Sequence, residues 1–283
     1  MEKQILVPTN FSKHAWNALV FGLKLYKKIS CKFILLNVYE DSHGLSDRIV
    51  GVKSEDNANT KETSKSGLDR IMQGLSFRKE NPNHEFEILS LEGDLDDAVQ
   101  EIINTRAIDL ILIGAEGANV NIHSSYKSKL SKLANSIQNC AMLFVPEEIE
   151  LSAQPLNEIV FPTTLRFPFK ERELDPLKDL ASNSGSPIRI LYIDSDNKGL
   201  TEEQKTLQTN FEGHLSTIKH SFHRLTKTTP STGIHLFIES RQSTMLALYK
   251  RKQGFFSKLF SQSKVDDIEF DPSVPVLLLK EVN

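Results

Sequence analysis

The chain has 283 residues, 39% of them hydrophobic and 25% charged, and its formal net charge is −3. The length favours two domains of about 140 residues, and the composition lacks the strongly basic character of a nucleic-acid-binding protein. No apolar run approaches the roughly 18 residues of a membrane-spanning helix, and the start lacks a signal-peptide pattern, so we expect a cytoplasmic protein that binds neither membranes nor nucleic acid.

The first half alternates short apolar runs with amphipathic stretches. The predicted strands cover residues 5–8, 32–39, 85–91, 109–113 and 141–146. The predicted helices cover residues 12–28, 61–78, 95–105 and 129–138, with Ser12 and Asp94 as N-caps. Residues 40–63 are polar and predict a surface loop. This alternation predicts a mostly parallel sheet with right-handed crossovers, hence one doubly wound, five-stranded α/β domain over residues 1–150.

The second half repeats this pattern. Residues 157–164 resemble the opening residues 4–9, which indicates an internal repeat with a period of about 150 residues. Further strands are predicted at 187–193, 221–225, 244–249 and 273–279, and helices at 169–182, 201–213 and about 231–241. We therefore expect a second five-stranded domain over residues 151–283, after a linker at Gln154-Pro155.

The feature most suggestive of a ligand is a glycine turn. Gly114 and Gly117 follow the buried strand 109–113, and a helical pattern resumes at about Lys129. Such a unit places backbone N–H groups at the carboxyl end of a strand, where open α/β sheets bind ligands and helix N-termini favour phosphate. The second copy lacks this turn, because Tyr249 is followed by a run of basic and then aromatic residues.

Metal and catalytic signals are weak. Cys31 and Cys140 lie far apart in apolar contexts, so we interpret them as buried thiols that cannot form a zinc site. His220 and His223 fall on opposite faces of a predicted strand. No nucleophile elbow and no Walker-type loop occurs. We predict no catalytic residue, no metal site and no activity beyond slow, incidental ATP hydrolysis.

Four segments together resemble the universal stress protein family. They are Pro8-Thr-Asn-Phe-Ser12, Leu-Asn-Val-Tyr at 36–39, Glu92-Gly-Asp94 and the strand and glycine turn at 109–117. The resemblance implies an adenine nucleotide alpha hydrolase-like fold and, in one subclass, bound ATP. That subclass carries the phosphate motif Gly, two residues, Gly, nine residues, then Gly-Ser or Gly-Thr. Gly114 and Gly117 match its first two positions. The third glycine is absent near Lys127-Ser128, and Asn10 stands where the family usually has Asp.

The resemblance also implies roles for individual residues. In an ATP-binding domain, Thr9 and Asn10 would line the base or ribose, and Val38 would contact adenine. Gly114, Gly117, Lys127 and Ser128 would hold the phosphates, with Mg²⁺ as the counter-ion. Family members pair through their last strands, so residues 142–145 would pair with 276–279 across a pseudo-two-fold axis and cover two apolar edges.

Two functional hypotheses therefore compete. In the first, ATP or another adenine nucleotide binds domain 1 and switches a stress-response interaction with an unknown protein partner. In the second, both pockets are degenerate, because a side chain at the third glycine position obstructs phosphate and residues 166–169 fill the second opening. The chain would then be a nucleotide-free interaction or scaffold module. Its surface at Phe255–Phe260 would be either an amphipathic helix over the sheet end or an exposed anchor. Whether the chain also forms homodimers is left open.

Overall fold

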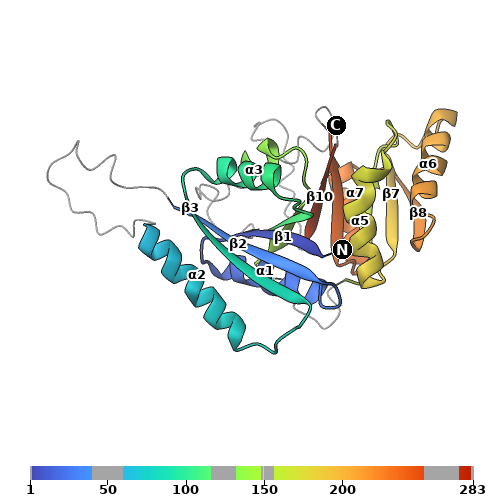
Figure 1. Cartoon of the computed structure of the whole chain (residues 1–283). Helices are drawn as coiled ribbons and strands as arrows, with labels where there is room; N and C mark the ends of the chain where they lie inside the picture. The colour runs from blue at the N-terminus through green and yellow to red at the C-terminus, as the bar shows by residue number, and fades with distance from the viewer. Residues whose placement is uncertain are drawn as a thin grey trace.

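The computed structural model describes residues 2–39, 60–115, 132–147, 149, 156–251 and 274–281. These residues form a ten-stranded sheet in the order β3-β2-β1-β4-β5-β10-β9-β6-β7-β8, with helices on both faces (Figure 1). The strands are β1 Lys3–Pro8, β2 Cys31–Tyr39, β3 His84–Glu92, β4 Leu110–Ala115, β5 Met142–Pro146, β6 Ile159–Thr163, β7 Ile188–Asp194, β8 His220–Thr226, β9 Met245–Lys250 and β10 Val276–Lys280. The helices are α1 Lys13–Leu25, α2 Lys61–Ser76, α3 Leu95–Thr105, α5 Glu171–Ser184, α6 Glu202–His214 and α7 Pro230–Arg241, together with a short helix at residues 132–136.

The sheet consists of two similar halves joined at its centre. Within each half the strands run parallel, and the order 3-2-1-4-5 of the first half is mirrored in the second. The halves meet where β5 and β10 pair antiparallel, with Phe144 opposite Val276 and Met142 opposite Leu278. Because the junction is antiparallel, the carboxyl edge of one half lies beside the amino edge of the other.

The apolar strands have a core on each side, as expected for strands covered by helices on both faces. Along β1, Ile5 and Val7 point into one core and Leu6 into the other, which is the alternation of an extended chain. The first core includes residues of α1, α2, α5 and α6, whereas the second includes residues of α3, helix 132–136 and α7. Each core continues across the junction of the two halves, and the predicted doubly wound α/β fold is confirmed.

The helix starts follow from local capping. Ser12 Oγ accepts a hydrogen bond from the Ala15 N–H, and Asp94 accepts one from the Asp96 N–H, so both predicted N-caps are confirmed. Thr201 and Thr229 cap α6 and α7 in the same way. The predicted loop at 40–63 lies outside the described residues up to residue 59. In the part of the chain that the structure describes, no helix has the length and hydrophobicity of a membrane span.

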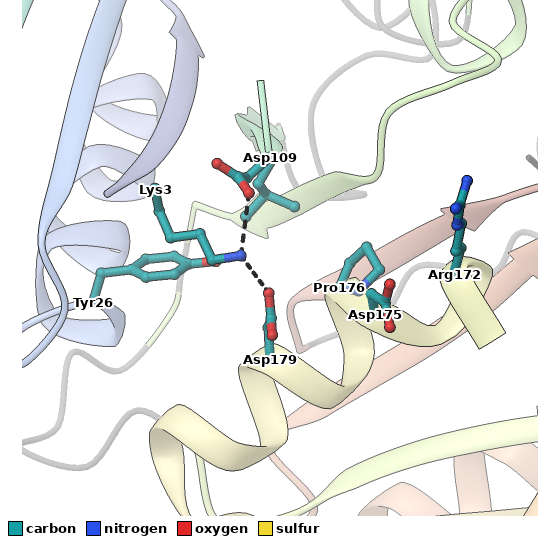
Figure 2. Close-up of a pocket in the computed structure, with 8 residues that line it drawn as sticks. Lys3, Tyr26, Asp109, Arg172, Asp175, Pro176 and Asp179 are labelled. Carbon is teal, nitrogen blue, oxygen red and sulfur yellow. Dashed lines mark hydrogen bonds and ion pairs between the residues drawn. The ribbon is translucent and has the colours of Figure 1, made fainter. Parts of the chain in front are cut away.

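Charged side chains connect the two halves on both sides of the junction. Lys3 of β1 reaches Asp109 Oδ1 at 3.1 Å and Asp179 Oδ2 of α5 at 2.5 Å (Figure 2). On the other side of the sheet, Lys250 and Lys280 both donate to the backbone carbonyl of Ala134 in helix 132–136. Both side chains thus cap one C-terminal carbonyl of a helix that belongs to the other half.

Lys280 is expected to make stability depend on pH. Burial, with a contribution from neighbouring Lys250, lowers the pKa of Lys280 to about 7. Between this value and its ordinary pKa near 10.5, the unfolded chain holds a proton that the folded protein has released. The free energy of unfolding therefore increases as the pH rises through this window. The destabilisation by the buried Lys280 charge is largest at pH 7 and below.

Lys280→Met should remove this cost. We expect the free energy of unfolding at pH 6.5 to increase by about 2 kcal/mol, after the loss of one hydrogen bond to the Ala134 carbonyl is included. We also expect the free energy of unfolding of the variant to rise less between pH 6.5 and 9.5 than that of the wild type does. Urea denaturation in buffers free of phosphate and sulfate measures both, with exposed Lys219→Met as the control. A variant that keeps the wild-type pH dependence would show that Lys280 is not responsible for it.

Candidate functional site

The carboxyl ends of β1, β2 and β4 bring together the predicted nucleotide-binding residues that the structure describes. Thr9 and Asn10 directly follow β1, Val38 lies near the end of β2, and Gly114 lies near the end of β4. Strand β1 lies between β2 and β4, so the chain leaves β1 on one side and returns on the other. This is the topological switch point, where a crevice for ligands forms in open α/β sheets. Gly117, Lys127 and Ser128 lie outside the described residues.

The loop after β1 is held by its own side chains. The Thr9 N–H donates to the Leu36 carbonyl at 2.8 Å, and Thr9 Oγ1 accepts the Phe11 N–H at 3.0 Å. Asn10 Oδ1 accepts the Ser12 N–H at 3.3 Å. These bonds stabilise a turn in which Phe11 has a φ of 63°, a left-handed conformation that is uncommon for a residue with a side chain. Thr9 and Asn10 thus shape the turn that begins α1 and present it to the crevice.

Asn37 is a residue of this edge that the sequence analysis did not single out. It is 3% exposed, and its Nδ2 donates to the Thr9 carbonyl at 2.7 Å. Its Oδ1 is buried and has no hydrogen-bond partner among the described residues. The available signal was a polar amide within the otherwise apolar predicted strand at 32–39. The Nδ2 hydrogen bond joins the end of β1 to β2. The unpaired Oδ1 lowers the stability of the protein, so a hydrogen-bond donor at this position would be favourable.

Gly114 allows the backbone of α1 to approach β4. A Cβ atom at this position would lie 2.4 Å from the His14 carbonyl oxygen and 2.7 Å from the Ala15 nitrogen. Real Cβ atoms do not come so close to backbone atoms, so only glycine fits between this strand and the first turn of α1. The glycine is therefore explained by helix packing. Its effect on the site is to bring the N-terminus of α1, which favours anions, against the end of β4.

The matching edge of the second half has the same turn. Thr163 Oγ1 accepts the Leu165 N–H at 3.2 Å, and Leu165 has a φ of 49°, as Thr9 and Phe11 do in the first half. The register is also the same, because β6 pairs with β9 at Ile159 and Met245 in the way that β1 pairs with β4 at Ile5 and Leu110. Tyr249 lies four residues after Met245, as Gly114 lies four residues after Leu110, so Tyr249 takes the position of Gly114.

Aromatic side chains fill the space at this second edge. The rings of Tyr249 and Phe169 meet edge-on with centroids 5.1 Å apart, and Phe169 also contacts Phe211 at 4.6 Å. Phe169 therefore packs against the core beside Tyr249, and the filling of the second opening by residues 166–169 stays a prediction. Phe167 differs, because it is half exposed and stacks under the Arg251 guanidinium. Since Tyr249 takes the space that α1 occupies against Gly114, α5 lies mainly against β10, whereas α1 lies against β4 and β5.

A cation that follows the predicted phosphate segment in the sequence is already paired. Lys132, the first described residue of helix 132–136, has its Nζ 3.0 Å from Asp96 Oδ2 and 3.4 Å from Asp94 Oδ1. The hydrogen bond to Asp96 raises the pKa of Lys132. The ion pair joins this helix to the start of α3, so Lys132 is less available to a phosphate group.

The structure assigns no metal or redox chemistry to the described residues. No group of three or more His, Cys, Asp or Glu side chains among them could hold a metal ion. Cys31 and Cys140 are buried free thiols, as predicted, and burial raises the pKa of each to about 12. Thiols with so little thiolate are poor nucleophiles. His223 faces Phe237 of α7 and lies within hydrogen-bond distance of Ser221 Oγ, which accounts for its position on β8.

The comparisons with known proteins agree with the architecture of the sheet. The model of the Universal stress protein family matches residues 1–136. The N-terminal half of this chain belongs to the universal stress protein family. No curated protein matches the chain.

Solved structures share the fold over both halves. A universal stress protein from Archaeoglobus fulgidus DSM 4304 is similar, with a TM-score of 0.67 and 15% identity over 98% of each chain. A putative universal stress protein from Pseudomonas aeruginosa UCBPP-PA14 has a TM-score of 0.53 and 12% identity, covering 98% of this chain and 93% of that one. The cytoplasmic domain of a prokaryotic cation chloride cotransporter has a TM-score of 0.54 and 10% identity, covering 99% and 96%. At these identities the likeness is one of fold.

Proposed function

We propose that this chain is a tandem universal stress protein, with domains at 1–150 and 151–283, in which the N-terminal domain alone binds an adenine nucleotide. ATP with Mg²⁺ would bind at the carboxyl ends of β1, β2 and β4, and its occupancy would switch an interaction with a protein partner. The proposal assigns no catalytic step to the chain.

The difference between the two equivalent crevices carries this proposal. In the first half Gly114 adds no side chain and α1 points its N-terminus at the end of β4. In the second half Tyr249 and Phe169 pack into the corresponding space. A nucleotide needs backbone donors near its phosphates, and the N-terminus of α1 against Gly114 would supply them at the first edge, whereas an aromatic side chain stands in that position at the second. Thr9, Asn10 and Val38 lie around the first edge, where the base or ribose would be.

A nucleotide-free scaffold is the second candidate function. It is favoured by the packing role of Gly114, which explains that glycine without any phosphate, and by the pairing of Lys132 with two carboxylates. The absence of a third glycine near Lys127 and Ser128 favours it as well. Under this alternative both domains would serve only to present surfaces to a partner.

Calorimetric titration with ATP and Mg²⁺ distinguishes the two functions. The nucleotide-stripped full chain should bind one ATP with micromolar affinity, and Gly117→Arg should weaken binding at least tenfold, since a long side chain would occupy the phosphate side of the turn. Gly213→Arg, on the exposed surface of α6, is the matched control and should bind like the wild type. Ser128→Gly should increase affinity by supplying the missing glycine. An absence of binding in both the wild type and Ser128→Gly would leave the scaffold function.

A further inference from the structure

The sheet ends in a strand with one unpaired side at each end, β3 in the first half and β8 in the second (Figure 1). The strands β5 and β10, each the last of its half, are already paired with each other. Among the strands that the structure describes, any further strand pairing therefore has to use β3 or β8. An unpaired edge is an open row of backbone donors and acceptors, which proteins usually protect with lysine, proline or a bulge.

The backbone groups that β3 presents at this edge follow from its hydrogen bonds to β2. The Asn83 carbonyl accepts the Cys31 N–H at 2.8 Å, and the Gly93 N–H donates to the Tyr39 carbonyl at 2.9 Å. In a parallel pair, alternate residues of a strand bond to the same neighbour, so the odd-numbered residues from 83 to 93 face β2. The even-numbered residues direct their N–H and C=O groups outward, and these are His84, Phe86, Ile88, Ser90 and Glu92.

The side chains of β3 leave this edge unprotected. The strand is nine residues long and contains no lysine, arginine, proline or glycine. Ile88, at its centre, is 41% exposed, and no other exposed large hydrophobic residue of the described chain lies in a strand. Glu87 is neutralised within its own chain, because its carboxylate lies 2.7 Å from both Lys32 Nζ and Arg106 Nη1. An edge of this length with an apolar centre favours the addition of a further strand.

We propose that β3 pairs antiparallel with β3 of a second copy of this chain, about a two-fold axis at Ile88, so that the sheet continues from one copy into the other. Ile88 would form a hydrogen-bonded pair with its own counterpart, and the two exposed side chains would cover each other. Phe86 would lie opposite Ser90 of the second copy, and His84 opposite Glu92. This is the register that pairs all nine residues of the strand.

The register is also complementary in charge. On the other face of the sheet, Glu85 would lie opposite Leu91 of the second copy, and Glu87 opposite Leu89. No two carboxylates are therefore directly opposite each other, which would be destabilising. The nearest two, Glu87 and its counterpart, would be diagonal neighbours, and each is neutralised by two cations of its own chain.

The other edge of the sheet is less suited to pairing with itself. Lys219 and Lys227 flank β8, and Arg224 lies within it. Self-pairing of β8 about its central residue, His223, would place Lys219 directly opposite Lys227 of the second copy, and such like charges are destabilising. Pairing of β3 with β8 would be heterologous and would give open filaments, whereas pairing of β3 with itself closes as a dimer.

Sedimentation velocity of the full chain, without nucleotide, tests the assembly. We expect a dimer, with twice the 32.0 kDa mass of one chain, that dissociates in the micromolar range. Ile88→Lys should weaken dimerisation at least tenfold, because it would place two ammonium groups opposite each other. Leu236→Lys is the matched control, since Leu236 is 53% exposed on α7 of the other half, and it should dimerise like the wild type.

A cysteine at the axis tests the register. The two Cα atoms of a hydrogen-bonded antiparallel pair lie about 5.5 Å apart, which a disulfide can span. Ile88→Cys should therefore form a disulfide-linked dimer under mild oxidation at least tenfold faster than Leu236→Cys, a control that is also exposed. The native Cys31 and Cys140 are buried and should not react. Equal rates in the two variants would contradict pairing at Ile88.

Three results of the sedimentation experiment would overturn the proposal. The first is a chain that remains monomeric up to submillimolar concentration. The second is dimerisation that Ile88→Lys leaves unchanged. The third is assembly beyond the dimer, which pairing of β3 with β8 would give. None of these results depends on nucleotide, so the dimer and the ATP site can fail their tests independently.

Discussion

Gly114→Ala is expected to lower the free energy of unfolding by about 3 kcal/mol. The new Cβ atom would lie 2.4 Å from the His14 carbonyl oxygen and 2.5 Å from its carbon. Because these are backbone atoms, no side-chain rotation relieves the overlap, and α1 has to move away from β4. Overpacking of this kind costs about 1 to 3 kcal/mol, and an overlap with backbone belongs at the upper end.

Urea denaturation followed by circular dichroism measures this loss. Gly213→Ala is the control, since a Cβ at Gly213 near the end of α6 meets no atom within 4 Å. That variant should be neutral or more stable by up to about 1 kcal/mol, because alanine is the better helix former. If Gly114→Ala were as stable as the wild type, the glycine would not be needed for packing, and phosphate binding would become the better explanation for it.

Glu158→Gln is expected to destabilise the protein by a similar amount, about 3 kcal/mol. The Glu158 carboxylate receives hydrogen bonds from Arg189 at 2.7 Å, Arg241 at 2.8 and 2.9 Å, and Ser243 at 2.6 Å. These contacts join β6, β7 and the end of α7. Glutamine keeps the size but leaves two guanidinium groups without their counter-charge, and breaking a buried ion pair on one side costs about 3 to 5 kcal/mol. The partial exposure of both arginines places the expected loss at the lower end.

The same carboxylate predicts acid sensitivity. Burial alone would raise the pKa of Glu158, but hydrogen bonds from Arg241, Ser243 and Arg189 outweigh burial and lower the pKa to about 2. The unfolded chain takes up a proton near pH 4.5, so the stabilisation is complete above that pH and is lost as the pH falls toward 2. Denaturation curves at pH 7 and pH 3 should show a smaller pH dependence for Glu158→Gln than for the wild type. Glu203→Gln, which changes an exposed glutamate of α6, should keep the wild-type dependence.

Local patterns in the sequence were sufficient for the secondary structure. Apolar runs bounded by polar residues predicted the inner strands, since these are buried on both faces and need apolar side chains throughout, whereas the edge strands β3 and β8 are only partly buried. The helix at 95–105 was predicted to the residue because Asp94 is an efficient N-cap and Ile102 and Ile103 lie on one face. The similarity of residues 157–164 to the start of the chain predicted the second half, and the matching turns at Thr9 and Thr163 show the same local chemistry.

The candidate site was only partly predictable. Thr9, Asn10, Val38 and Gly114 do come together at one edge, because parallel strands end on the same side of a sheet. Their individual roles were not readable from a motif. Thr9 and Asn10 use their side chains to hold a backbone turn, and Asn37 contributes a buried amide that no spacing rule singled out. Gly117, Lys127 and Ser128 stay predictions.

The α/β class, the order of the elements and the lack of a glycine turn in the second copy all follow from residues that are neighbours along the chain. Other features depend on residues that are far apart in the sequence and meet only in the folded chain. Gly114 is needed because His14 lies against it, and Tyr249 takes the equivalent space in the second half, where it packs against Phe169. A cavity at the junction of the two halves forms because β5 and β10 run antiparallel, which brings Arg172, Asn139 and Lys280 to one place. Contacts of this kind are set by packing and register, and those exist only once the chain has folded.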